Sequence, residues 1–340
     1  MIEQFDYDSF TPRVAVVGVG GQGSNLVNRL YINGIQSATT IAINTDLAHL
    51  NLIKAHKKVL IGREITKGLG AGGYPEVAAK CADMSKGDIE KVLEGYNLVF
   101  ISAGMGGGTG TGASPAIARI AKESGATVIA TVTFPFSLER SRMTKAEWGI
   151  HQLSKEADAV IVIENEKLLS YVPNLPMEKA FELSDNITGN AVKGIADTIM
   201  LPSLINLDFA DLRTIVKNTG TAVISIGTGN GTDRTEQVVR STRTHPLLSV
   251  DYEGAKGALV HVSGGGDLTI KEATRIGEGV TESLAPDANV IFGARLIPEL
   301  RGQIRVMSIV TGVKAKFGLK TRMEMTPAEP LRIENIERIF

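Results

Sequence analysis

The stretch Gly104-Met105-Gly106-Gly107-Gly108-Thr109-Gly110-Thr111-Gly112 decides the fold. It follows an apolar run at 98–101 that predicts a buried strand, and it precedes Ser114-Pro115, which predicts the cap and first residue of a helix. Glycines in such a turn expose backbone N–H groups, and the helix dipole adds positive potential. A flexible linker is the alternative, but linkers rarely lie between a buried strand and a capped helix. The stretch therefore predicts a polyphosphate site, with Thr109 and Thr111 as hydroxyl donors.

Residues 106–112 resemble the signature of the tubulin/FtsZ superfamily of GTPases, and they do not form a Walker A loop, because the chain contains no Gly-Lys dipeptide. The resemblance implies an α/β fold with a Rossmann-like GTP-binding domain, a long central helix and a smaller α/β C-terminal domain. GTP or GDP is the implied ligand, and Mg²⁺ accompanies it because no P-loop lysine neutralises the phosphates. The contacts implied in this stretch come from Gly104, Gly106, Gly107, Gly108, Thr109, Gly110, Thr111 and Gly112. The expected parts are residues 1–176, 177–201 and 202–318, followed by a tail at 319–340.

Composition excludes several classes of protein. The 340 residues suffice for about two domains, and 43% apolar content allows packed cores. A net charge of −1 offers no basic field for nucleic acid. The one cysteine, Cys81, cannot form an intrachain disulfide and is typical of a reducing cytosol. No apolar run approaches the ~20 residues of a membrane span, the N-terminus lacks a secretory signal, and the five histidines show no metal-ligand spacing. We expect a cytoplasmic protein that binds no nucleic acid and does not insert into a membrane.

A second glycine motif makes an NAD-dependent oxidoreductase the serious rival. Gly18, Gly20 and Gly23 satisfy G-x-G-x-x-G after a strand at 13–17, and Asn44-Thr45-Asp46 follows a strand at 40–43. On these residues alone the two interpretations are evenly balanced. The rival leaves the second phosphate loop unexplained, whereas in the FtsZ family both loops line one nucleotide. The contacts that the resemblance implies here come from Gly20, Gly21, Gln22, Asn25, Asn44 and Asp46.

Three further loops resemble nucleotide-binding segments of the family. Gly70-Ala71-Gly72-Gly73 is flexible enough for either a surface loop or a γ-phosphate switch, and the resemblance favours the switch. Glu139 and Arg142 match the acid and the arginine of the family's ribose loop, with a spacer one residue shorter than usual. Asn165, after an apolar strand at 159–163, matches a base-contacting asparagine.

A long helix is predicted at 175–201, beginning near Met177. Phe181 and Asp185 are four residues apart and therefore share one face of it. Spacing alone favours a core phenylalanine beside a surface aspartate, but the resemblance assigns both to the base. A carboxylate accepts from the two donors of guanine, N1–H and the amine, whereas adenine would leave it unpaired. Guanine is therefore the predicted base.

The segment Asn206-Leu207-Asp208-Phe209-Ala210-Asp211 is similar to the Asn-x-Asp-Phe-Ala-Asp loop of the FtsZ family. Asp208 and Asp211 suit an ordinary helix cap, yet together with Asn206 they also suit the positioning of an attacking water. The helix before them spans about 30 Å, so they should serve the nucleotide of a neighbouring subunit. This implies a head-to-tail homopolymer with assembly-dependent GTP hydrolysis, acting at a mid-cell division ring. A nucleotide-binding scaffold without hydrolysis is the remaining alternative.

The rest of the chain predicts a second α/β unit and a tail. Apolar runs predict strands at 222–227, 258–262, 288–292 and 304–311, and helices are expected at 235–244 and 269–284. At 331–340 apolar and charged residues alternate at near-helical spacing after a proline-containing segment, which is consistent with a disordered end or a docking peptide. The resemblance implies a membrane-adaptor protein of the SepF or FtsA type as its partner. The short linker is more typical of archaeal than of bacterial members.

Overall fold

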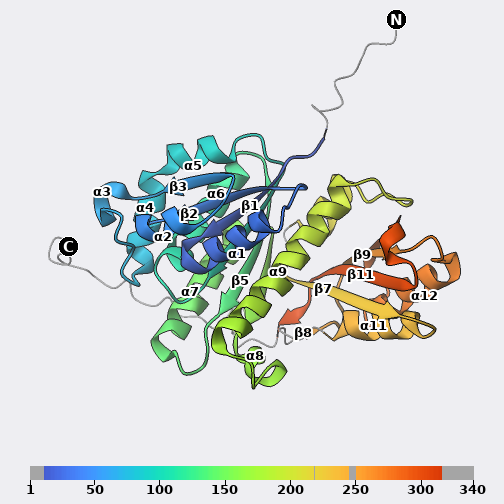
Figure 1. Ribbon diagram of the computed structural model, residues 1–340. Helices are drawn as coiled ribbons and strands as arrows, with labels where there is room; N and C mark the ends of the chain where they lie inside the picture. Colours follow the sequence, from blue (N-terminus) through green and yellow to red (C-terminus); the bar gives the residue numbers. More distant parts are fainter. Residues whose placement is uncertain (1–10, 218, 245–249, 316–340) are drawn as a thin grey trace, which may run out of the picture.

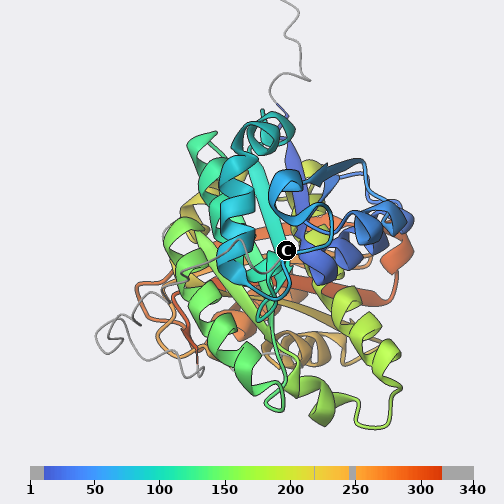
Figure 2. The same ribbon diagram turned by 90° about the vertical axis from the view of Figure 1, so that its left-hand side faces the viewer.

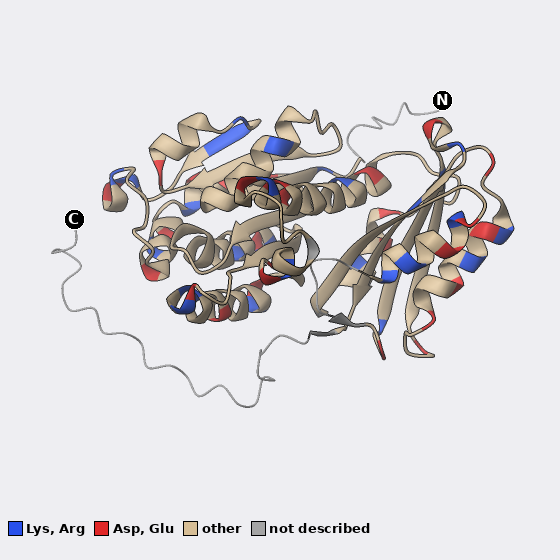
Figure 3. Cartoon of the chain, turned by 60° about the horizontal axis from the view of Figure 1, so that its bottom comes forward, with Lys and Arg blue, Asp and Glu red and all other residues tan. Residues whose placement is uncertain are grey.

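A central sheet runs through the whole molecule, with helices packed on both of its faces (Figure 1). The computed structural model describes residues 11–217, 219–244 and 250–315. The predicted tail at 319–340, including its docking peptide, lies outside the described residues. Among the described helices, none is long and apolar enough to cross a membrane. Figure 3 shows charged residues mostly on helices and loops, while the strands between them carry few.

The first half of the chain forms a parallel sheet in the order β6-β5-β4-β1-β2-β3. Five of its strands are buried along nearly their whole length because helices cover both faces, whereas the edge strand β3 begins with two lysines and is partly exposed. Their bounds are Val14–Val19 (β1), Thr39–Asn44 (β2), Lys57–Leu60 (β3), Leu98–Gly104 (β4), Thr127–Phe134 (β5) and Ala159–Glu164 (β6). The strands expected from the sequence are confirmed with small shifts at their ends.

Helices on the two faces of this sheet bury separate apolar clusters. One cluster lies under α4, α5, α6 and α7, and the other lies under α1 and α9 and continues into the second half of the chain. Figure 2, turned by 90°, shows the sheet edge-on between these layers. The helices are Gly20–Ile32 (α1), Leu47–Leu52 (α2), Arg63–Thr66 (α3), Pro75–Met84 (α4), Lys86–Leu93 (α5), Thr109–Glu123 (α6), Arg140–Glu156 (α7), Glu166–Tyr171 (α8) and Met177–Met200 (α9).

The second half of the chain adds strands to the same sheet, beyond β6. The join is narrow: β6 pairs with β7 at two positions, whereas β7 and β11 pair along nine. A third apolar cluster lies under α11 and α12. The elements are Phe209–Val216 (α10), Gly220–Asn230 (β7), Arg234–Arg243 (α11), Val250–Asp251 (β8), Gly257–Gly264 (β9), Ile270–Thr281 (α12), Asn289–Leu296 (β10), the 3₁₀ turn Pro298–Leu300 (η2), Gln303–Thr311 (β11) and Lys314–Ala315 (β12).

One expected boundary is wrong: α6 begins at Thr109, not at Pro115. The N–H of Gly112 already donates to the carbonyl of Gly108 at 2.9 Å, and Ser114 donates to the carbonyl of Gly110 instead of capping. The glycines allow this early start, because a Cβ on Gly112 would overlap the carbonyl oxygen of Pro75 in α4. The second half of the glycine-rich stretch therefore serves close helix packing, and the loop proper ends at Gly108.

Candidate functional site

The phosphate loops of the sequence lie side by side at the carboxyl ends of β1 and β4. These two adjacent strands are where the strand order reverses, which is the position at which open α/β sheets form their ligand crevice. A Cβ on Gly20 would come within 2.9 Å of the nitrogen of Gly110. Gly21 and Gly107 face open space, with no atom within 4 Å of an added Cβ. The N-termini of α1 and α6 thus meet at one anion site.

The Gly70–Gly73 segment packs against this site, although it lies far from both α1 and α6 in the sequence. A Cβ on Gly108 would come within 2.9 Å of the Cβ of Ala71 and 3.2 Å of the nitrogen of Gly73. Gly72 has φ +59° and Gly73 φ +80°, a conformation that favours glycine. The segment therefore lies directly beside the phosphate loop, and its expected role as a γ-phosphate switch stays a prediction.

The two threonines of the stretch have different positions. The hydroxyl of Thr109 is partly exposed and lies 2.7 Å from the hydroxyl of Thr45, so it fastens the phosphate loop to the end of β2. Thr111 is fully buried, and its hydroxyl accepts from the N–H of Gly106 at 2.8 Å. The hydroxyl of Thr111 thus holds the loop in shape from inside, and the phosphate contact expected of it stays a prediction.

The predicted acid after β2 also has a local partner. Asp46 caps α2 by accepting from the N–H of His49 at 2.9 Å. Asn44 is buried and accepts from the N–H of Thr45 at 2.9 Å. Both residues lie at the carboxyl end of β2, next to β1, and thus beside the phosphate loops.

The predicted base contacts gather at the other side of the site. Asn165, at the end of β6, is buried, and its side-chain oxygen has no hydrogen-bond partner. A buried amide oxygen without a partner costs free energy, and a guanine donor would satisfy it. The ring of Phe181 packs edge-to-face against Phe136 at 5.9 Å, so the two aromatics form one apolar wall.

Asp185 lies on the same face of α9 and contacts α1. Its carboxylate is 3.2 Å from the Nε of Arg29, and a second nitrogen of Arg29 is 3.1 Å from Glu182. The side chain of Asp185 is 12% exposed. This burial raises the pKa of Asp185 to about 6, and the Arg29 guanidinium opposes the shift. Asp185 is thus a carboxylate that titrates just below neutral pH.

This pKa predicts that GTP affinity falls in mild acid. Guanine offers two donors, so the ionised carboxylate is the form that binds, and protonation removes an acceptor. Between pH 7 and pH 5 the ionised fraction drops from about 0.9 to about 0.1, so the Kd for GTP should rise about tenfold. Nucleotide affinity measured across this range tests the expectation.

The matched control is Asp185→Asn, which cannot titrate. At pH 7 the Kd of this variant for GTP should be higher than that of the wild type. Between pH 7 and pH 5 it should change only through titration of the phosphates of GTP itself. The ratio of the two affinities isolates Asp185, and a ratio independent of pH would contradict its assignment to guanine.

The predicted ribose loop is held by an internal ion pair. Glu139 lies 2.6 Å from Arg142 and accepts from the N–H of Phe136 at 3.1 Å. The Arg142 side chain is 61% exposed, while its backbone packs against the phosphate loop at Gly106. Both residues therefore border the site, but in this structure they bind each other.

The predicted acid loop, residues 206–211, lies at the amino ends of the parallel strands, opposite the phosphate loops. Asp208 and Asp211 form a reciprocal capping box at the start of α10. Asp208 borders a hollow of about 710 Å³ that is shared with Asn97 and Pro12, which precede β4 and β1 at the amino ends of these strands. Asn206 lines the same hollow, and its side-chain oxygen accepts from the N–H of Ser203 at 2.8 Å. The three residues are close together but are not part of the nucleotide set.

Comparisons with known proteins agree along the chain. Residues 13–173 match the model of the tubulin/FtsZ family GTPase domain, and residues 220–314 match that of the FtsZ family C-terminal domain. The chain belongs to the FtsZ family. It is 56% identical over 306 residues to cell division protein FtsZ 2 of Methanocaldococcus jannaschii, covering 89% of this chain and 80% of that one. Cell division protein FtsZ 2 of Haloferax volcanii is 51% identical, with 92% and 78% covered.

Solved structures give the same result for the fold. The FtsZ dimer of M. jannaschii superposes with a TM-score of 0.84 at 40% identity, covering 95% of this chain and 96% of that one. CetZ2 of Haloferax volcanii, at 21% identity and a TM-score of 0.77 over 89% and 94% of the two chains, shares the fold. The chain is thus a tubulin-fold GTPase whose family ligands are GTP, GDP and Mg²⁺, and the oxidoreductase alternative is wrong.

Three contacts at the FtsZ-type site were not predicted from the sequence. Arg29 binds Asp185, Thr45 binds Thr109, and Lys145 of α7 donates to the carbonyl of Gly73 at 2.7 Å. A partial signal existed for Arg29, which follows Asn25 by one helical turn and so shares its face of α1. Lys145 carried no such signal, because its contact depends on how α7 packs.

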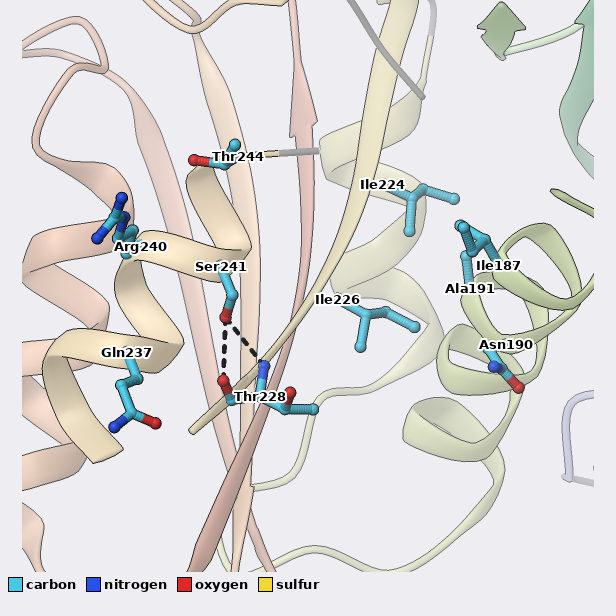
Figure 4. A pocket seen from close by; sticks show the side chains of 10 residues that line it. All are labelled: Ile187, Asn190, Ala191, Ile224, Ile226, Thr228, Gln237, Arg240, Ser241 and Thr244. Carbon is cyan, nitrogen blue, oxygen red and sulfur yellow. Dashed lines mark hydrogen bonds between the residues drawn. The ribbon is translucent and has the colours of Figure 1, made fainter. Parts of the chain in front are cut away.

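A separate cleft of about 710 Å³ lies between α9 and the second half of the sheet (Figure 4). Its walls are apolar on the side of α9 and β7, with Ile187, Ile224 and Ile226, and polar on the side of α11, with Gln237 and Arg240. None of the site residues predicted from the sequence lines it.

Proposed function

We propose that this chain hydrolyses GTP at a site completed by the next copy of itself in a head-to-tail filament. The observation that carries the proposal is the separation of the two groups of residues across the sheet. β4 has seven residues and so spans about 23 Å between the amino end, beside the acid loop, and the carboxyl end, at the phosphate loops. A side chain cannot bridge that distance, so the acids serve another molecule's nucleotide. GTP turnover measured against protein concentration tests this.

The two parts have complementary roles. Backbone N–H groups at the starts of α1 and α6 hold the phosphates, and Mg²⁺ bound with the nucleotide neutralises charge between them. Asp208, which borders the hollow, and Asp211, its partner in the capping box, orient the attacking water, while Asn206 shapes the loop that carries them.

Exposed apolar side chains lie beside the nucleotide site and beside the acid loop. They support a contact between these two unlike surfaces of neighbouring copies. Leu69 and Leu138, beside the phosphate and ribose loops, are each 79% exposed. Leu204 and Ile205, at the acid loop, are 73% and 47% exposed. A heterologous contact between such surfaces does not close on itself and therefore produces a filament.

The cellular role follows from the relatives. Proteins named for cell division share about half of this chain's residues, which supports a filament that acts at the division site. We place it in the cytoplasm at a mid-cell ring. The division into residues 1–176, 177–201, 202–318 and 319–340 belongs to the same proposal. GTP turnover at high protein concentration separates this function from that of a non-hydrolysing scaffold.

We also propose that the segment 331–340 docks on a membrane-adaptor protein of the SepF or FtsA type. The support is its alternation of apolar and charged residues after Pro327 and Pro330. Deleting residues 326–340 should leave GTP turnover and polymerisation unchanged and abolish recruitment to membranes, seen by fluorescence microscopy. The matched control replaces Glu334 and Glu337 by Gln and should retain recruitment. Insoluble protein on deletion would show that the tail belongs to the fold.

A further inference from the structure

Arg295, on strand β10, binds the end of the central helix α9. It is 9% exposed. Its guanidinium donates to the carbonyls of Asp197 at 2.8 Å, Leu201 at 2.6 Å and Pro202 at 3.1 Å, and to the hydroxyl of Ser203 at 3.2 Å. All four acceptors belong to the last turn of α9 and the segment that leads into the acid loop.

This arrangement requires an arginine. The last carbonyls of a helix have no intrahelical partner, and they carry the negative end of its dipole. A guanidinium has five donors in a fixed fork and can serve several such acceptors at once, whereas an ammonium is a point charge. The nearby carboxylate of Asp197 is already paired with Lys193. Arg295 therefore donates its hydrogen bonds to three backbone carbonyls and one hydroxyl.

The two residues before Arg295 hold the same segment from the same strand. Ala294 and Ile205 exchange backbone hydrogen bonds of 3.0 and 3.1 Å. Gly293 leaves room for Leu207, because a Cβ there would come within 2.5 Å of the Cγ of Leu207. Leu207 is buried and directly precedes Asp208. Three successive positions of β10 thus fix the chain from the end of α9 to the first catalytic acid.

We propose that Arg295 is the positioning residue of the acid loop: it holds the end of α9 and the following segment so that Asp208 and Asp211 face the neighbour's phosphate. This rests on the proposed function above. The hydrogen bonds of Arg295 go to residues 197–203 and not to the nucleotide site, so its loss should lower turnover within the filament and leave nucleotide binding to the subunit unchanged.

Arg295→Gln is the test variant, and its kcat for GTP should fall at least tenfold. KM and the Kd for GTP should stay within a factor of two, and filaments should still form. Arg295→Lys should recover part of the loss, because one ammonium replaces some of the four contacts. The matched control is Arg275→Gln, the same change at an exposed arginine of α12, 3.3 Å from Glu236, and it should turn over GTP like the wild type.

Mixing experiments separate positioning from general damage. Arg295→Gln supplies a sound nucleotide site, and Gly107→Asp, whose added charge faces the phosphates, supplies a sound acid loop. Their mixture should regain turnover, as should Asp211→Ala mixed with Gly107→Asp. If only the Asp211→Ala mixture regains turnover, Arg295 supports the whole fold and the inference is wrong. Wild-type turnover by Arg295→Gln alone would also overturn it. If the Asp211→Ala mixture stays inactive, the shared site itself fails.

Discussion

Asp211→Ala should bind GTP and assemble, yet hydrolyse GTP roughly a hundredfold or more slowly, since removing a group that orients the attacking water costs about that much. Its carboxylate binds the backbone of Asp208, which lies at the amino ends of β1 and β4, opposite the phosphate loops, so a subunit's own nucleotide site remains intact. Filaments of the variant should therefore persist long after wild-type filaments have disassembled. GTP turnover and light scattering, followed in the same sample, measure both effects.

The dependence on protein concentration is the control for this result. Wild-type turnover per molecule should rise steeply above the concentration at which filaments form, because each site needs two subunits. Gly107→Asp, whose added charge would face the phosphates, should fail to bind nucleotide through charge repulsion. Constant turnover per molecule down to monomeric concentrations would rule out the shared site.

Gly112→Ala should be the most damaging single methyl group in the nucleotide-binding half. The new Cβ would overlap the backbone carbonyl of Pro75, and a backbone atom cannot move aside as a side chain can. Helices α4 and α6 must then separate, at a cost on the order of 3 kcal/mol. The melting temperature should fall by roughly 6–12 °C, and GTP affinity should fall with it because α6 carries the phosphate loop. Thermal unfolding with and without GTP measures both.

Gly87→Ala is the matched control. Gly87 lies within α5 with no atom near its added Cβ, so alanine there should stabilise the protein by about 0.5–1 kcal/mol through helix propensity. Unfolding of Gly112→Ala at the wild-type temperature would contradict the packing role given to that glycine.

Local pattern predicted the buried strands and α9 well, because a continuous apolar run or a long amphipathic period indicates burial by itself, whereas the half-exposed edge strand β3 was not predicted. It failed at the start of α6, where Ser114-Pro115 carries the usual start signal and yet lies inside the helix. The absent side chains of Gly110 and Gly112 decide that boundary through contacts with β4 and α4. Such contacts depend on tertiary packing, so the spacing of residues in the sequence does not reveal them.

Prediction of the functional site from the sequence was limited in the same way. Sequence motifs identified the loops, and the carboxyl ends of neighbouring parallel strands then brought them together. They could not show that Thr111 faces inward, or that Arg29 from α1 would meet Asp185 from α9. They also gave no sign of Arg295, since an isolated arginine in a strand is ordinary until its acceptors, about ninety residues earlier, are known.

Because β6 and β7 pair at two positions, the join between the two halves of the sheet has low resistance to shear. Among the residues that the structure describes, nine paired positions resist shear between β7 and β11, whereas two backbone rungs resist it between the halves of the sheet. When a filament of such subunits is bent, torsional strain therefore concentrates at this seam. The central helix α9 contacts α1 on one side of this seam and β7 and β11 on the other, so it is the rigid element that links the two halves across it.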